Sequence, residues 1–203
     1  MIRKALEHKQ METLEVIRNR CSLKEQISPR EIEPGILYTV LDAARYAASS
    51  RNHQPWRFVV VQGQPAVQAL VDAAVTGTNA VIRNAPVVIA VCARPQDDSI
   101  SNGREYYLFD TGMAVANLLL AATDFGLVTH PMAGFDEAAL KRHLHIPEDV
   151  RVLMITPLAY PASESYDEAA RERLSQRSRK AFEEVVFFNR WGEIQPEMDA
   201  IRA

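Results

Sequence analysis

The sequence predicts a mixed fold, α/β or α+β, in which helices surround one β-sheet. Three observations support this prediction. Helical and strand-like patterns alternate along the chain, short continuous apolar runs have the length and β-branched content of strands, and residues 104–125 form one long apolar helix. The chain of 203 residues is long enough for one domain with a substantial core and short for two, so we expect a single domain over 1–203.

The first half of the chain contains three predicted helices and two predicted strands. Apolar residues at helical spacing predict a first helix that ends near Asn19 or Arg20 and a second over about 36–47. The run 56–61 (WRFVVV) is too short for a helix and predicts a buried strand. Pro65 fits the first turn of a third helix, and the run 86–93 (PVVIAVCA) predicts a strand buried on both faces.

The second half begins with a polar loop at 96–103. A helix is predicted over 104–125, ends before Gly126, and is apolar nearly all round, as is typical of a central helix packed on several sides. Asp136 is a predicted N-cap of a short helix through Leu144, and 150–159 supplies another strand. Residues 161–180 are polar and charged, and 181–191 (AFEEVVFFNRW) are again rich in apolar residues.

Composition argues against several classes of protein. The formal net charge of −3 gives no general attraction to nucleic acid or to anionic membranes. The most apolar segment, 113–122, is shorter than the roughly 20 residues needed to span a bilayer. The first twenty residues carry charges throughout, and the two cysteines, Cys21 and Cys92, suit a reducing compartment. We therefore expect a cytoplasmic protein with neither nucleic acid nor a membrane as a partner.

The segment 20–24 (RCSLK) is the first group of candidate site residues. Arg20, Ser22 and Lys24 can surround a phosphate with a fork of donors, a hydroxyl and a point charge. The same residues could instead form a solvated basic turn at a helix C-terminus. Cys21 lies between the two cations, and either a thiol with a lowered pKa or a buried inert thiol is compatible with that position.

The loop at 49–54 is the second group. Ser49, Ser50, Asn52 and Gln54 can satisfy the polar edges of a heteroaromatic ring or a ribityl chain. Such residues are also common in turns, so the fixed order SSxNxQPW carries more weight than the composition.

Two further segments are candidates. The run 177–180 (RSRK) is basic, although a charge run is usually a solvated face. In 131–135 (PMAGF), Gly134 could let the backbone approach a planar ligand or could serve a turn.

His143 and His145 are two residues apart and face opposite ways on a helix, so no metal site is expected there. No GxGxxG follows a predicted strand, which argues against a dinucleotide-binding half.

Four segments, in this order, resemble the FMN-dependent nitroreductase family. RCSLK resembles the family's Arg-x-Ser-x-Arg phosphate motif, with Lys24 in place of the usual arginine. ASSRNHQPW at 48–56 resembles PSSxNxQPW, with Ala48 where proline is common. The helix DTGMAVANLLLAATDFGL with the following THPMAGF is similar to the core helix and flavin-edge strand, and RSRKAFEEVVFFNRW at 177–191 to the terminal segment.

The resemblance implies an α+β nitroreductase-like fold, with a central, mostly antiparallel sheet surrounded by helices and a long buried central helix. It also implies a homodimer that binds FMN noncovalently at the subunit interface, with 181–203 reaching over the partner. The implied phosphate contacts are Arg20, Ser22, Lys24, Arg177 and Arg179, with Cys21 in the same segment. Ser49, Ser50, Asn52 and Gln54 are implied to contact the rest of the flavin, and much of this loop comes from the partner subunit. The backbone of Ala133 and Gly134 is implied to lie against the ring, with an amide that donates to N5. Asn79 is implied to face the pyrimidine edge.

The implied activity is NAD(P)H-dependent oxidoreduction by a ping-pong mechanism. NADH or NADPH reduces FMN and leaves, and a nitroaromatic, quinone or similar electrophile takes its place. Because the cofactor carries the chemistry, no side chain is assigned a catalytic proton-transfer role. The alternatives are a flavin carrier or sensor without turnover, or a reductase for enals or semialdehydes or a dehalogenase on the same fold. The acceptor pocket is expected within 96–109, with Arg104, Tyr106 and Phe109 as candidate wall residues. The two aromatic residues could equally belong to a helix start that packs on the core.

Overall fold

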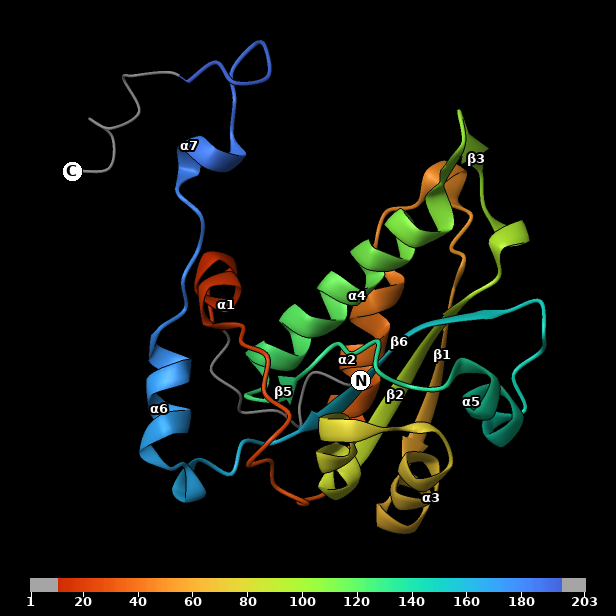
Figure 1. The fold of residues 1–203 in the computed structure, drawn as a ribbon, viewed down its shortest axis with the longest axis vertical. Coiled ribbons are helices and arrows are strands. Elements are labelled where there is room, and N and C mark those ends of the chain that lie inside the picture. The colour runs from red at the N-terminus through yellow and green to blue at the C-terminus, as the bar shows by residue number, and fades with distance from the viewer. Residues whose placement is uncertain (1–10, 195–203) are drawn as a thin grey trace. The chain divides into compact units, whose positions relative to one another are not determined.

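The computed structural model describes residues 11–194 and divides into two compact units, residues 1–165 and 166–203. The larger unit contains a four-stranded sheet in the order β1-β2-β6-β5 (Figure 1). The strands are β1 (Trp56–Gln62), β2 (Val87–Ala93), β5 (Val128–Thr129) and β6 (Arg151–Ala159). All three pairings are antiparallel. The predicted antiparallel sheet surrounded by helices is confirmed, and the fold is α+β rather than α/β.

Helices cover the sheet on both faces. Helices α2 (Pro34–Arg45) and α4 (Tyr106–Asp124) lie side by side on one face, as Figure 1 shows. Helices α3 (Gln64–Ala74) and α5 (Glu137–Leu144) contact each other and strands β1, β2 and β6. Helix α1 (Thr13–Asn19) contacts α4. The connecting 3₁₀ turns are η1 (Ser50–Asn52), η2 (Gly77–Asn84), η3 (Pro95–Asp97) and η4 (Ser163–Ser165).

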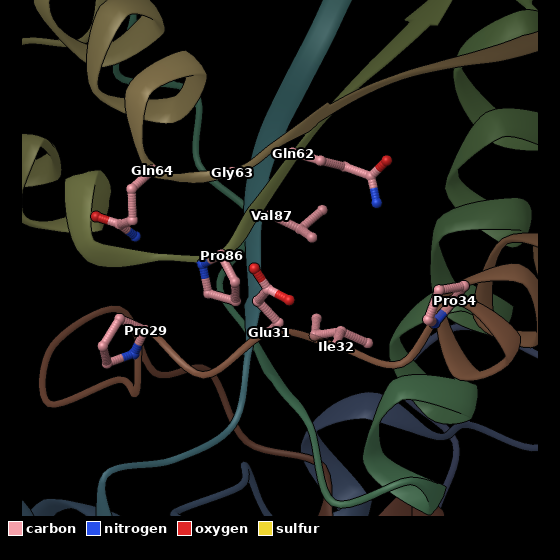
Figure 2. A pocket seen from close by; sticks show the side chains of 9 residues that line it. All are labelled: Pro29, Glu31, Ile32, Pro34, Gln62, Gly63, Gln64, Pro86 and Val87. Atoms are coloured by element: carbon pink, nitrogen blue, oxygen red, sulfur yellow. The ribbon is translucent and has the colours of Figure 1, made fainter.

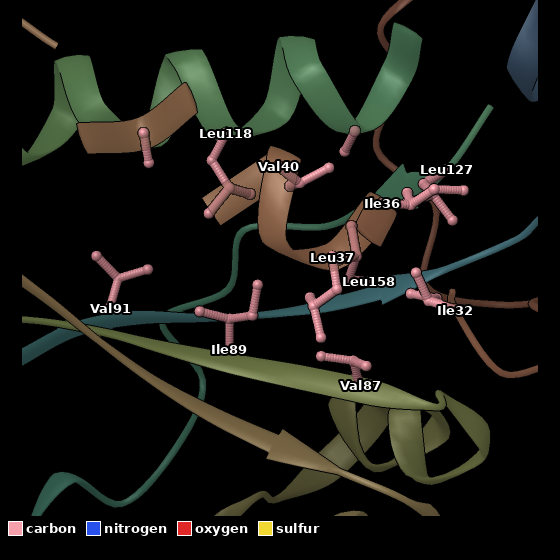
Figure 3. Close-up of a cluster of buried hydrophobic side chains, with 12 residues drawn as sticks. Ile32, Ile36, Leu37, Val40, Val87, Ile89, Val91, Leu118, Leu127 and Leu158 are labelled. Atoms are coloured by element: carbon pink, nitrogen blue, oxygen red, sulfur yellow. The ribbon is translucent and has the colours of Figure 1, made fainter. Parts of the chain in front are cut away.

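The core is built on β2, whose residues are all at most 3% exposed. Its alternate side chains Val87, Ile89 and Val91 pack against α2 and α4, as Figure 3 shows. The intervening side chains point to the opposite face, because successive residues of a strand alternate. The central strand is therefore covered on both sides, which confirms the prediction from the continuous apolar run at 86–93.

Strand β1 differs from its prediction as a buried strand. It lies at the edge of the sheet and pairs with β2 alone among the described strands. Arg57 is exposed, and Phe58, Val59 and Val60 are only partly buried. The β-branched composition predicted a strand correctly, but composition does not distinguish an edge strand from a central one.

The predicted helix over 104–125 begins later than expected. Arg104–Glu105 form strand β4, which pairs with β3 (Ile100–Ser101) inside the predicted polar loop, and α4 begins at Tyr106. The turn residues Asn102 and Gly103 have φ of 52° and 75°. Asn-Gly favours this left-handed turn geometry. The dipeptide therefore indicates a hairpin, although the segment was predicted to be a loop.

Helix α4 is central in its middle and exposed in its first turn. Ala114, Leu118 and Ala122 are fully buried, as expected for a central helix. Leu108 and Phe109 are 47% and 65% exposed in the single chain. The first turn of α4 therefore presents apolar surface that residues 11–194 leave exposed.

The smaller unit contains α6 (Glu168–Ser175) and the short α7 (Phe182–Val185). The N-cap of α6 is Asp167, whose side chain accepts the Ala170 N–H at 2.7 Å. No helix was predicted in this polar segment, because α6 has a mostly charged surface and few apolar residues to show a helical period. That 1–203 forms one domain remains a prediction.

Helix α5 begins and ends as predicted. The Asp136 side chain accepts the Ala139 N–H at 2.9 Å, and the helix ends at Leu144 before a left-handed residue, His145, with φ of 54°.

Glu137 joins the first turn of α5 to β6. Its carboxylate accepts hydrogen bonds from Arg151 Nε at 3.0 Å and from the Val152 N–H at 2.9 Å. Lys141 Nζ lies 3.7 Å from the same carboxylate. Partial burial by itself raises the pKa of Glu137, but the hydrogen bonds and the two cations together outweigh burial, so the pKa is lowered.

Replacing Glu137 with glutamine should reduce the free energy of unfolding by about 1–2 kcal/mol at neutral pH, because the Arg151 and Val152 donors lose a charged acceptor. The folded-state pKa lies below the ordinary value of 4.5, so this stabilisation is present above that pH and is lost as the pH falls through the lowered pKa. Urea unfolding from neutral to acid pH measures it. The exposed Glu164→Gln is the control, and a Glu137→Gln deficit that does not shrink in acid would contradict the assignment.

Candidate functional site

The loop at 49–54 has a tightly determined backbone. Arg51, Asn52 and Gln54 have positive φ of 49°, 61° and 51°, which non-glycine residues seldom adopt. The Ser49 hydroxyl accepts the Gln54 N–H at 3.0 Å, and the Ser49 carbonyl accepts the Asn52 N–H at 3.0 Å. Such a backbone persists only when its surroundings fix it, and it is typical of functional sites.

The surroundings of the loop supply these restraints. The Ser50 N–H donates to Asp110 Oδ2 on α4 at 2.6 Å, and the Ser50 hydroxyl lies 3.3 Å from Ser99 Oγ. His53 Nδ1 lies 3.1 Å from Asp98 Oδ1. Arg57 Nη1 on β1 donates to the Gln54 carbonyl at 3.0 Å. The loop is therefore held by α4 and the segment before β3 at Ser50, and by β1 at Gln54.

Asp110 is a buried acid beneath this loop. Burial raises the pKa of its carboxyl, the nearby Asp98 raises it further, and the Ser50 N–H and His53 only partly offset the increase. The sequence analysis did not single out Asp110. A carboxylate among the apolar residues at the start of α4 was the pattern that could have found it.

A second group brings together three predicted site residues from distant parts of the sequence. Lys24 Nζ donates to Asn79 Oδ1 at 2.7 Å and to Thr78 Oγ1 at 3.2 Å. Asn79 Nδ2 donates to the Gly134 carbonyl at 3.3 Å. Lys24, Asn79 and Gly134 are therefore connected by one chain of hydrogen bonds, which the spacing in sequence could not show.

The backbone at 133–134 is open. Ala133 and Gly134 are both exposed, and within residues 11–194 their N–H groups donate to no backbone acceptor. The segment is fixed from both sides, since Met132 and Ile155 exchange backbone hydrogen bonds at 2.9 and 3.0 Å and the Phe135 N–H donates to the Ala133 carbonyl at 3.1 Å. A Cβ built on Gly134 would collide with the Asn79 amide nitrogen. Two fixed donors are thus available to a ligand that lies against this backbone.

The segment 20–24 is attached to the sheet near these donors. Ser22 forms a bridge with Thr129, and the Leu23 N–H donates to the Thr129 carbonyl at 2.9 Å. Arg20 Nη1 donates to the exposed Ser22 hydroxyl at 3.3 Å. Arg20 and Ser22 are thus side by side, as a phosphate-binding pair would require, and Cys21 between them is a half-buried free thiol.

Arg177 and Arg179 belong to the smaller unit, after α6, and both are exposed. Arg179 Nη1 donates to the Ser178 carbonyl at 2.7 Å. Their predicted phosphate role remains a prediction.

The loop at 49–54 and the group of Lys24, Asn79 and Gly134 are separate within this chain. No hydrogen bond or ion pair between described residues joins them. The loop enters β1 at its first residue, Trp56, whereas the 20–24 segment joins Thr129. Across the sheet, Thr129 pairs with Leu158, Leu158 with Val87, and Val87 with Gln62, which is the last residue of β1. The loop and the 20–24 segment thus meet opposite ends of the sheet.

His130 was not assigned a role from the sequence. Its Nδ1 is buried and has no hydrogen-bond partner within the described chain. Burial lowers the pKa of His130, and the positive charge of Lys24 lowers it further. A neutral imidazole therefore lies beside the 20–24 segment.

Two cavities flank the loop and the start of α4. One of about 420 Å³ is lined by Ser50, Arg51, Ser99, Ile100, Ser101 and Tyr106. The other, of about 360 Å³, is lined by Arg104, Glu105, Tyr106 and Phe109. The three residues predicted as pocket walls, Arg104, Tyr106 and Phe109, thus share one cavity, with the Tyr106 and Phe109 rings 6.1 Å apart.

A further cavity of about 390 Å³ lies where β1 ends and β2 begins, as Figure 2 shows. It is lined by Pro29, Glu31, Ile32, Pro34, Gln62, Gly63, Gln64, Pro86 and Val87. It contains none of the predicted site residues.

Between Met11 and Ile194, no helix is long and apolar enough to cross a membrane. In the same part of the chain, no three His, Cys, Asp or Glu side chains are grouped as metal ligands.

Comparison with known proteins identifies the family. Residues 17–76 and 62–160 match the Nitroreductase family. A Methanothermobacter thermautotrophicus protein, provisionally named NADH dehydrogenase/NAD(P)H nitroreductase, is 31% identical over 75% of this chain and 78% of its own length. The crystal structure of a nitroreductase family protein from Clostridium novyi NT has a TM-score of 0.69 at 31% identity, over 90% of this chain and 96% of that one.

The fold also matches a provisionally named nitroreductase from Exiguobacterium sibiricum 255-15 in complex with FMN. The TM-score is 0.68 at 19% identity, over 77% of this chain and 91% of that one, so this likeness shows the fold alone. Both the sequence match and the shared architecture lead to one conclusion: the chain belongs to the nitroreductase family.

Proposed function

We propose that this member of the nitroreductase family is an FMN-dependent NAD(P)H oxidoreductase that reduces small electrophiles. The observation that carries the proposal is the group of Lys24, Asn79 and Gly134, in which three predicted flavin contacts are joined by hydrogen bonds. The names of relatives support the same class, since one is a provisional NAD(P)H nitroreductase and a structural neighbour is complexed with FMN.

The residues present fit FMN. Arg20 and Ser22 offer a guanidinium and an exposed hydroxyl to a phosphate. The exposed N–H groups of Ala133 and Gly134 offer donors to the edge of a planar ring. Gly134 has no Cβ, which leaves room for the Asn79 amide directly against this backbone. We infer that Arg177 and Arg179 add charge at the phosphate, as the family resemblance implies.

Lys24 has a different role in this proposal from the one its motif position implies. Its ammonium donates to Asn79, which in turn contacts Gly134, so it belongs with the predicted ring contacts more than with Arg20. We propose that Lys24 and Asn79 face the pyrimidine edge of the flavin. Positive charge at that edge favours the reduced, more negative state of the ring.

We propose a homodimer, because the flavin contacts within one chain form two separate groups. A second copy would bring its own loop at 49–54 to the group of Lys24, Asn79 and Gly134. The apolar side chains that one copy leaves exposed support this, namely Leu14 and Ile17 on α1 and Leu108 and Phe109 on α4.

When bound, FMN would accept a hydride from NADH or NADPH and, after the oxidised nicotinamide has left, would deliver electrons to a nitroaromatic, quinone or similar acceptor. The chain's own residues hold and orient the ring, and no side chain is assigned a proton-transfer role. The cavity of Arg104, Tyr106 and Phe109 is our candidate for the acceptor wall. A cytoplasmic location remains a prediction from composition.

The test is the absorption spectrum of the purified protein, repeated without oxygen after NADH and then after NADPH is added. Bleaching of a flavin spectrum is the expected result, and the faster donor identifies the preferred nicotinamide. A flavin spectrum that does not bleach would support a carrier or sensor. No flavin, even after incubation with FMN, would contradict the proposed function.

The double variant Arg20→Ala with Arg179→Ala should lose FMN while the protein stays folded. Contacts between a charged donor and a phosphate contribute on the order of 1.5–3 kcal/mol each, so the pair should weaken FMN binding roughly a hundredfold or more. Fluorescence titration with FMN measures the loss, and circular dichroism checks the fold. Unchanged FMN affinity would show that these two arginines do not bind the phosphate.

Lys24→Met should weaken FMN binding about tenfold and make the flavin midpoint potential more negative, because a charged donor near the ring is lost. Titration with FMN and spectroelectrochemistry measure the two effects. Arg142→Met, an exposed change on α5 that also removes one positive charge, is the control. A weaker affinity with an unchanged potential would place Lys24 at the phosphate instead of at the ring.

A further inference from the structure

Two acidic side chains meet beneath the loop at 49–54 and are both shielded from water. The Asp98 side chain is 0% exposed, and Asp110 is 1% exposed. They come from different elements, since Asp98 follows η3 and Asp110 lies in the second turn of α4. Two ionised carboxylates in such a place would be costly, because each loses hydration and each repels the other.

The hydrogen bonds of the pair leave one oxygen without a partner. Asp98 Oδ1 accepts the Ser99 N–H at 2.7 Å and lies 3.1 Å from His53 Nδ1. Asp110 Oδ2 accepts the Ser50 N–H at 2.6 Å. Asp98 Oδ2 is buried and, among the described residues, has no donor. Ser50 connects the two acids, because its N–H donates to Asp110 and its hydroxyl lies 3.3 Å from the hydroxyl of Ser99, the residue after Asp98. A hydrogen bond with Asp98 also raises the pKa of Asp110, so a proton between the two acids would satisfy this oxygen.

We propose that Asp98 and Asp110 share one proton, and that this shared proton holds the loop at 49–54 between α4 and the segment before β3. Both acids are positioning residues: Asp110 fixes Ser50, and Asp98 fixes His53. The consequence for the flavin rests on the proposed function, in which this loop contacts FMN. The effect on the loop itself does not.

The direction of the pH dependence follows from the burial of the pair. The titratable groups acting on Asp110 are Asp98 from the segment before β3 and His53 from the loop. Next to them, Arg57 on β1 is paired with Asp97 at 3.2 Å, which keeps a compensated charge pair beside the site. Burial raises the pKa of Asp110 above its ordinary value, so the bridge is present at low pH and is lost as the pH rises through that raised pKa.

The matched variants are isosteric amides. In Asp110→Asn, the amide oxygen can still accept the Ser50 N–H, and the amide nitrogen can donate to Asp98 Oδ2 without any titrating proton. Asp98→Asn gives the reciprocal donor and serves as a second variant if the first does not fold. Asp110→Ala removes both contacts and should release the loop at every pH.

The experiment is amide hydrogen exchange at Ser50 over a pH series, corrected for the intrinsic exchange rate. In the wild type the protection of the Ser50 amide should fall by up to about tenfold per pH unit above the raised pKa of Asp110, whereas Asp110→Asn should remain protected throughout. Protection that is flat with pH in the wild type would overturn the proposal. A pH slope that persists in Asp110→Asn would also overturn it, because the pH dependence would then not require the carboxyl of Asp110.

FMN titration at the same pH values distinguishes this proposal from the proposed function. An FMN affinity that follows the Ser50 protection, in the wild type and in Asp110→Asn alike, supports both. If the FMN affinity is constant over the pH range in which the protection of the Ser50 amide changes, the result supports the shared proton and overturns the flavin role of the loop. FMN affinity that falls in Asp110→Asn at low pH, where the wild type binds, overturns the positioning role of the pair.

Discussion

Strand β2 is the element on which both layers of the larger unit depend. Because the strand is covered on its two faces, Val87, Ile89 and Val91 pack against α2 and α4, and the residues between them face the α3 and α5 layer. Its two edges pair with β1 and β6, which carry the connections to the candidate site. Burial of apolar side chains on both faces stabilises this strand, and its backbone pairing sets the register of β1 and β6.

The candidate site is built at two ends of this sheet. At one end the loop at 49–54 leads into β1, and its left-handed backbone is held by Asp110 from α4. At the other end the 20–24 segment attaches to Thr129 through backbone pairing. A rigid sheet keeps each group in place but does not bring the two together in one chain. That separation is the physical reason for inferring a second copy.

Much of the site was predictable because its residue types reflect local chemistry. The loop order SSxNxQPW and the segment RCSLK are local patterns, and the Asp136 cap of α5 follows from one residue and its neighbours. The hairpin at Asn102-Gly103 was equally local and was missed, because the polar residues were interpreted as a loop. Helix α6 was missed because a charged helix gives no apolar period.

The sequence by itself determined the strands β1, β2 and β6, the main helices, the family and the residues expected to contact a flavin. Those features depend on composition and spacing within short segments. Only the tertiary structure joined Lys24 to Asn79, made β1 an edge strand, and brought Asp98 and Asp110 together beneath the loop at 49–54. Each of these depends on contacts between residues of different elements, and such contacts are determined by packing, which no local pattern records.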